Sequence, residues 1–111
     1  WKGKILFLEE VKEEPYRVDR MLTQWKLNGV FDELSGVVLG QFRKCIPEEP
    51  EWSFSLQEVF DYHFKNVNFP VFSGFLCGHI LDKFTLPVGQ TVEMDASKFS
   101  IKPLSPSVKF L

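Results

Sequence analysis

The residues of this sequence best suited to acid–base chemistry are two adjacent glutamates and a distant histidine. Glu9 and Glu10 directly follow the apolar run of residues 5–8, and His79 follows Gly78. A carboxylate beside an imidazole fixes the ring tautomer and stabilises the imidazolium that forms when the histidine takes up a proton. Such a pair forms two of the three members of a hydrolase triad. The sequence leaves open which of the two glutamates would orient the ring.

The third member of a triad, the nucleophile, has no convincing candidate. No serine lies on a G-x-S-x-G-like turn between a strand and a helix. Cys77 is two residues from His79, but such neighbours in an extended segment have a poor angle for proton transfer, so we discount it. His63 lies beside Phe64 in a helical pattern, which favours a structural or exposed histidine over a catalytic one. We therefore expect half of an active site.

The elements that must position these residues form an alternating α/β pattern. Residues 5–9 and 37–39 are short and mainly apolar, as is typical of strands buried on both faces, and a third strand is expected within residues 69–74. Residues 16–28 carry apolar side chains at helical spacing after Pro15, which suits the first turn of a helix. This order predicts a small parallel sheet with helices packed on it.

The second half of the chain predicts one more helix and a β-hairpin. Ser53 or Ser55 can cap the helix, and Glu58 stands three residues after Ser55 as in a capping box. Residues 91–95 and 99–102 alternate between apolar and polar side chains, which predicts an antiparallel hairpin. The expected fold is a single α/β domain with a small parallel sheet, two helices and this hairpin.

A parallel sheet would bring the candidate residues together. Ligands of open α/β sheets bind beyond the carboxyl ends of the strands. Glu9 or Glu10, Gln41 and His79 would gather at that edge, and Gly40 there suggests the close approach of another group.

Composition excludes several classes of function. The 111 residues are 44% hydrophobic with a net charge of −2, so they lack the basic surface expected for nucleic acid or an anionic membrane. No apolar run approaches the roughly 20 residues of a membrane span. Cys45 and Cys77 lack CxxC spacing and a set of matching ligands, so we expect free buried thiols and neither a metal nor a cofactor. The chain begins with Trp1 rather than Met, so we expect further natural sequence upstream.

Three stretches carry a family resemblance over nearly the whole chain, in the right order: GKILFLEEVKEEPYRVDRMLTQW, NGVFDELSGVVLGQF, and GFLCGHI with LPVGQTVEMD. They resemble the C-terminal domain of the LD-carboxypeptidases, serine peptidases that trim murein tetrapeptides and are grouped with the microcin immunity peptidases. The resemblance implies a swivelling β/β/α fold for residues 1–111 and an enzyme of two domains. It also implies a Ser-Glu-His triad whose serine lies in a G-x-S-D turn of the N-terminal domain, which this chain lacks.

Carried over residue by residue, the resemblance implies that Glu9 is the triad acid and His79 the triad base. Glu10 stands where the family usually has Asp. Gln41 matches a loop near the active-site cleft and is expected to contact substrate. The implied partners are the N-terminal domain and the murein tetrapeptide, with a homodimer also compatible, in a cytoplasmic enzyme of peptidoglycan recycling.

Three functions follow as alternatives. The first is the C-terminal half of an LD-carboxypeptidase that releases terminal D-alanine, with this piece inactive on its own. The second is a peptidase of the microcin immunity type, which acts on toxic peptide-nucleotides. The third is a non-catalytic swivelling binding module, in which Glu9 and His79 are ordinary polar residues at strand ends.

Overall fold

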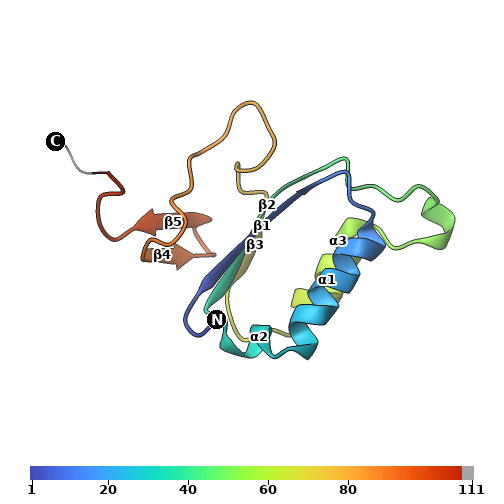
Figure 1. Cartoon of the computed structure of the whole chain (residues 1–111), viewed down its shortest axis with the longest axis horizontal. Coiled ribbons are helices and arrows are strands. Elements are labelled where there is room, and N and C mark those ends of the chain that lie inside the picture. The colour runs from blue at the N-terminus through green and yellow to red at the C-terminus, as the bar shows by residue number, and fades with distance from the viewer. Residues whose placement is uncertain (109–111) are drawn as a thin grey trace.

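A three-stranded parallel sheet lies at the centre of the computed structural model, which describes residues 1–108 (Figure 1). The strands, in spatial order, are β1 (Ile5–Val11), β2 (Gly36–Arg43) and β3 (Val71–Ser73). This confirms the predicted parallel core. β2 is longer than the predicted 37–39, because its last residues continue to pair with the end of β1 although they are not an apolar run.

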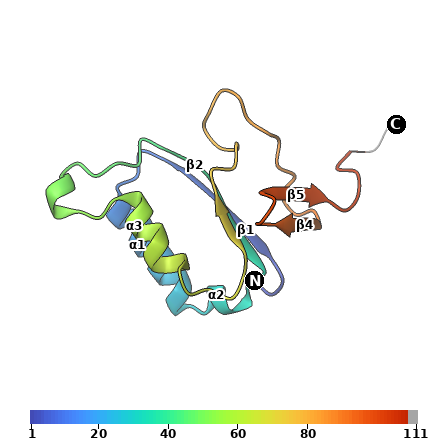
Figure 2. The same cartoon turned by 180° about the vertical axis from the view of Figure 1, so that it is seen from behind.

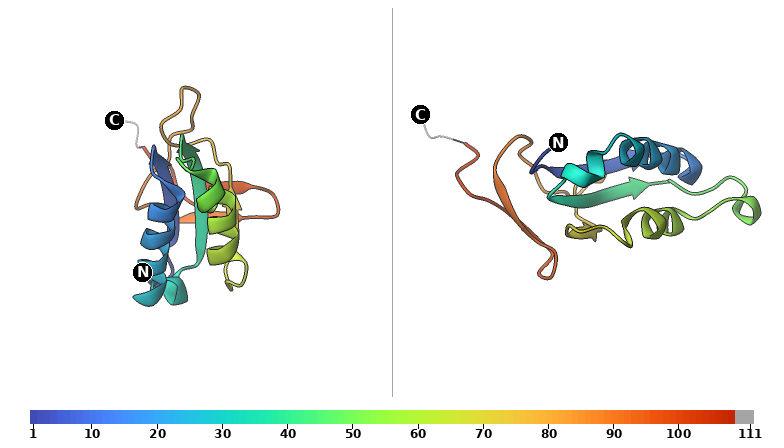
Figure 3. Two further views of the ribbon diagram at one scale, coloured as in Figure 1. Left: turned by 90° about the vertical axis from the view of Figure 1, so that its right-hand side faces the viewer. Right: turned by 90° about the horizontal axis from the view of Figure 1, so that it is seen from below.

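Helices cover one face of the sheet. They are α1 (Pro15–Leu27), α2 (Val30–Glu33) and α3 (Leu56–Phe64), while the 3-10 helix η1 (Pro50–Trp52) lies in the loop before α3, away from the sheet (Figure 1). α1 and α3 lie side by side along the strands (Figures 1 and 3). The predicted capping box at the start of α3 is present, with Ser55 and Glu58 bonded in both directions. The single turn of α2 was not among the helices expected from the sequence.

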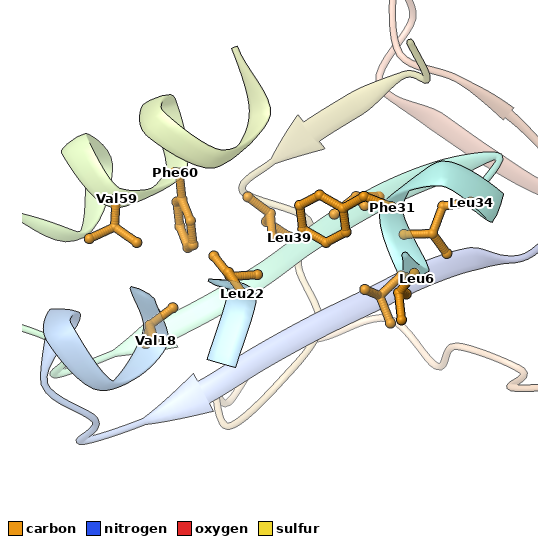
Figure 4. Packing of buried hydrophobic residues seen from close by; sticks show 10 residues of the cluster. Leu6, Val18, Leu22, Phe31, Leu34, Leu39, Val59 and Phe60 are labelled. Carbon is orange, nitrogen blue, oxygen red and sulfur yellow. The ribbon is translucent and has the colours of Figure 1, made fainter. Parts of the chain in front are cut away.

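The main core fills the space between these helices and the sheet (Figure 4). Leu39 of β2 lies near Leu22 of α1 and Phe60 of α3, whereas Leu6 of β1 lies beside Leu34, which follows α2 (Figure 4). Leu22 and Leu39 are almost completely buried. Because burial of one such side chain contributes about 1.5–3 kcal/mol, this layer fixes the strands that carry the candidate site.

The opposite face of the sheet is covered by the chain that follows β3. Phe7 packs edge-on against Phe75, with ring centroids 6.5 Å apart. Val38 of the central strand β2 is fully buried. The predicted hairpin is present as β4 (Val92–Asp95) and β5 (Ser100–Pro103), which pair antiparallel. Seen from behind, the chain after β3 rises past the end of β2 before it reaches this hairpin (Figure 2). No helix within residues 1–108 is both long and apolar enough to cross a membrane.

Candidate active site

Glu9 lies at an irregularity in the pairing of β1 with β2. Leu8 pairs with Leu39, but Glu10 pairs with Phe42, so a single β1 residue faces two residues of β2. This is a β-bulge, a feature that re-aims side chains and is common next to active sites. The extra residue lies on β2, so β1 keeps its alternation and Glu9 lies on the same face as Phe7, away from the helices.

The structure brings Glu9 and His79 into direct contact. The ring Nδ1 of His79 lies 2.9 Å from Oε2 of Glu9, although the residues are 70 positions apart. An ionised carboxylate can only accept a hydrogen bond, so in the neutral ring Nδ1 carries the proton and Nε2 is the basic nitrogen. Within residues 1–108, Nε2 makes no hydrogen bond.

The two members of this pair differ in exposure. The side chain of Glu9 is 25% exposed, whereas that of His79 is 70% exposed. The carboxylate is thus held against the sheet while the ring remains accessible from outside. This arrangement suits a base that acts on a group brought by another part of a protein.

Glu10 has a different environment. Its Oε1 accepts a hydrogen bond of 2.8 Å from the backbone N–H of Val11, and it borders a shallow groove with Arg17 and Arg20 of α1. Glu10 thus lies on the helix side of the sheet. Glu9 is therefore the acid that contacts the imidazole, while the catalytic role of the pair stays a prediction.

Two glycines allow the segment with His79 to approach the strands closely. A Cβ on Gly40 would lie 2.6 Å from the carbonyl oxygen of Cys77, so a larger residue would push this segment away. A Cβ on Gly78 would lie 2.9 Å from Oε2 of Glu9, and Gly78 has a φ of +127°, which side-chain-bearing residues rarely adopt. The close approach suggested by Gly40 in the sequence is thus confirmed, and Gly78 makes room for the carboxylate.

Gln41 supports the segment that leads to His79. Its side-chain amide donates to the carbonyl of Phe75 at 3.2 Å, and its backbone N–H donates to the carbonyl of Cys77 at 2.9 Å. Its predicted contact with substrate stays a prediction.

Arg43 was absent from the sequence candidates, yet its Nη1 donates to the carbonyl of His79 at 3.2 Å. A bond to a backbone carbonyl depends on no particular side chain at the acceptor, so no sequence motif indicates it.

Of the remaining candidates, His63 and Cys45 lie apart from this pair, and Cys77 lies on the same segment as His79. His63 is only 2% exposed, and its Nε2 lies 2.7 Å from Oδ1 of Asp19 on α1, so it is a structural histidine as the sequence favoured. Cys45 is buried, and burial raises the pKa of its thiol. Cys77 is half-buried rather than buried, because the segment that carries it lies over the sheet edge.

The family model and the relatives that match this chain point to the same family of proteins. A family model described as "LD-carboxypeptidase C-terminal domain" matches residues 1–94. A Bacillus subtilis (strain 168) protein named "Probable murein peptide carboxypeptidase" is 34% identical over 97 residues, which cover 87% of this chain and 30% of the relative. The Escherichia coli "Microcin C7 self-immunity protein MccF" is 32% identical over 111 residues, which cover 98% of this chain and 30% of the relative.

Solved structures agree with the sequence comparison. The muramoyltetrapeptide carboxypeptidase from Oxalobacter formigenes has a TM-score of 0.72 at 34% identity, over 82% of this chain and 32% of that one. A structure of MccF in complex with aspartyl sulfamoyl adenosine has a TM-score of 0.80 at 28% identity, over 97% of this chain and 32% of that one. The chain therefore spans about a third of the length of the relatives it matches.

Proposed function

Because the chain belongs to the family of LD-carboxypeptidase C-terminal domains, we propose that it supplies the acid and the base of a Ser-Glu-His triad in a serine-type LD-carboxypeptidase. The observation that carries the proposal is the 2.9 Å contact between Nδ1 of the exposed His79 and Oε2 of Glu9. The serine belongs to a nucleophile-bearing domain outside this chain. The substrate is a murein tetrapeptide, from which the enzyme releases the terminal D-alanine.

The proposed mechanism gives each residue one role. Nε2 of His79 takes the proton of the serine hydroxyl as its oxygen attacks the carbonyl carbon before D-alanine. Glu9 holds Nδ1–H and stabilises the imidazolium. His79 then gives this proton to the amine of D-alanine, the amide bond breaks, and an acyl-enzyme remains. Water, deprotonated by the same Nε2, then attacks the acyl-enzyme, and His79 returns that proton to the serine oxygen as the ester bond breaks. Backbone N–H groups of the other domain stabilise the oxyanion in both steps.

This division of the triad has two consequences. The 111-residue chain alone is expected to be inactive, because it holds the base and its orienting acid without the nucleophile. The reaction also requires the other domain to place its serine against an imidazole that is 70% exposed here. A role in peptidoglycan recycling, and with it a cytoplasmic location, is part of the same proposal.

The second candidate is a peptidase of the MccF type. MccF matches 97% of this chain with a TM-score of 0.80, more than the 82% and 0.72 of the murein enzyme. The same Glu9 and His79 would serve both, since each reaction transfers an acyl group to the serine. We place the murein substrate first because both murein enzymes, the named relative and the solved structure, are 34% identical to this chain, whereas MccF is 32% identical in the sequence comparison and 28% in the structure comparison.

The test is D-alanine release from murein tetrapeptide by the full-length gene product, with a peptidyl sulfamoyl adenosine as the competing substrate. We expect faster turnover of the tetrapeptide. His79→Ala should lower kcat by about 10²- to 10⁴-fold, the usual contribution of a general base. Lys83→Ala, which changes an exposed residue of the same segment, should retain activity.

Two outcomes would contradict the proposal. Unchanged kcat in His79→Ala, with wild-type thermal stability in both variants, would remove His79 from the mechanism. No turnover of either substrate by the wild-type protein would instead favour the non-catalytic swivelling module.

A further inference from the structure

The end of β2 holds the segment that carries His79 at three points. The carbonyl of Leu39 accepts from the N–H of Phe75 at 3.1 Å, and the N–H of Gln41 donates to the carbonyl of Cys77 at 2.9 Å. The third contact is the 3.2 Å hydrogen bond from Nη1 of Arg43 to the carbonyl of His79. Alternate residues of one strand thus hold residues 75, 77 and 79.

These three contacts are not equivalent, because Gly78 separates the first two from the third. A glycine moves between backbone conformations more readily than any other residue, and Gly78 has a φ of +127°. Bonds to residues 75 and 77 therefore fix the chain directly only up to this glycine, and the chain is next tied back to this part by the N–H of Phe84, which bonds to the carbonyl of Leu76 at 2.7 Å. The N–H of Ile80 bonds to the carbonyl of Gly78 at 3.0 Å, but this bond lies within the segment and moves with it.

The Arg43 bond is the contact with β2 that acts beyond the glycine. It holds the carbonyl of His79 itself, and so restricts the orientation of the peptide group that follows the Cα carrying the imidazole. The contact between His79 and Glu9 tolerates little rotation, because a hydrogen bond weakens steeply as its angle falls. Arg43 therefore controls a rotation to which the pair is sensitive.

We propose that Arg43 is a positioning residue for His79: its guanidinium holds the His79 carbonyl so that the imidazole lies on Glu9 with Nε2 turned outward. The inference rests on the proposed function for its effect on turnover, while its effect on the imidazole is independent of that function. Arg43 acts through the backbone of His79 and does not contact the reacting atoms. Its loss is therefore expected to lower kcat and leave KM unchanged.

The experiment compares three variants of the full-length protein. Arg43→Met removes the donor and keeps an unbranched side chain, whereas Arg43→Lys keeps a cation that can donate one bond. Lys44→Met is the matched control, because it removes a positive charge from the neighbouring exposed residue, which makes no hydrogen bond to residue 79 within residues 1–108. Two quantities are measured: kcat and KM for D-alanine release, and the proton NMR signal of the His79 Nδ1–H.

We expect Arg43→Met to lower kcat about tenfold, less than the roughly 10²-fold cost of a full 1 Å misplacement, with KM unchanged. Its Nδ1–H signal should broaden or shift as the bond to Glu9 weakens. Arg43→Lys should recover part of both losses, and Lys44→Met should match the wild type. A purely structural role would lower stability without moving the Nδ1–H signal of the folded protein.

Two results would overturn the inference. One is a Nδ1–H signal in Arg43→Met that is identical to that of Lys44→Met. The other is an increase in KM at constant kcat, which would make Arg43 a substrate contact. If the wild-type protein releases no D-alanine, the proposed function fails, and the Nδ1–H signal alone decides whether Arg43 positions the ring.

Discussion

At the scale of single residues, the described residues 1–108 contain two imidazole–carboxylate pairs with opposite surroundings. His79 is 70% exposed and lies on Glu9 at the sheet edge, whereas His63 is 2% exposed and bonds Asp19 between α3 and α1. The Nδ1 of His63 is buried and has no partner within residues 1–108. The exposed pair can take part in proton transfer with another group, while the buried pair joins two helices.

The buried pair gives a prediction about stability. Asp19→Ala should lower the free energy of unfolding by about 1–3 kcal/mol, because the buried Nε2–H of His63 would lose its acceptor. Asp19→Asn should lose less, since its carboxamide oxygen can still accept. Urea unfolding measures both, with Asp82→Ala on the exposed surface as the control. Equal stability of Asp19→Ala and the control would contradict a structural role for this pair.

At the scale of elements, the start of α3 depends on reciprocal bonds between Ser55 and Glu58. The Ser55 hydroxyl accepts from the backbone N–H of Glu58 at 3.3 Å, and the Ser55 N–H donates to the Glu58 carboxylate at 2.8 Å. The bonds from the backbone and the hydroxyl of Ser55 hold the pKa of Glu58 below its ordinary value of 4.5. The carboxylate form is therefore favoured in the folded state.

This lowered pKa predicts a pH dependence of stability. A carboxyl with a lower pKa in the folded state stabilises the fold above its ordinary pKa, and this contribution is lost as the pH falls through the folded value. The stability difference between wild type and Glu58→Gln should be constant near neutral pH and shrink below about 4.5. Urea unfolding over this range measures it. A difference that grows toward acid pH would contradict the assignment.

Local signals explain which elements the sequence could predict. The capping box of α3, Pro15 at the start of α1 and the alternation of the hairpin all act between near neighbours, and each feature is present. The bulge opposite Glu9 depends instead on pairing between distant strands. For this reason the sequence predicted β2 too short. It could not choose between Glu9 and Glu10, because the face of β1 that meets the segment with His79 is decided by tertiary packing. The backbone bond of Arg43 was missed for the same reason.

At the scale of the whole molecule, the candidate pair lies on a surface that the proposal assigns to another domain. Leu81, Phe84 and Val88 follow His79 and are exposed, with Leu81 98% accessible. Exposed apolar side chains of this kind are common at sites of protein contact. The chain spans about a third of the relatives it matches, so a nucleophile-bearing domain is a fitting partner for this surface.

The decisive comparison is between two variants of the full-length protein, Glu9→Gln and Glu10→Gln, assayed for D-alanine release from murein tetrapeptide. A carboxamide at residue 9 cannot stabilise the imidazolium of His79, so kcat should fall by about 10²- to 10⁴-fold. Glu10→Gln changes a carboxylate on the helix side of the sheet, so kcat should stay within about twofold of the wild-type value. Such a change is small, since a tenfold change in rate corresponds to about 1.4 kcal/mol in the activation free energy. Equal kcat values in the two variants would contradict the assignment of Glu9 and His79 as a catalytic pair.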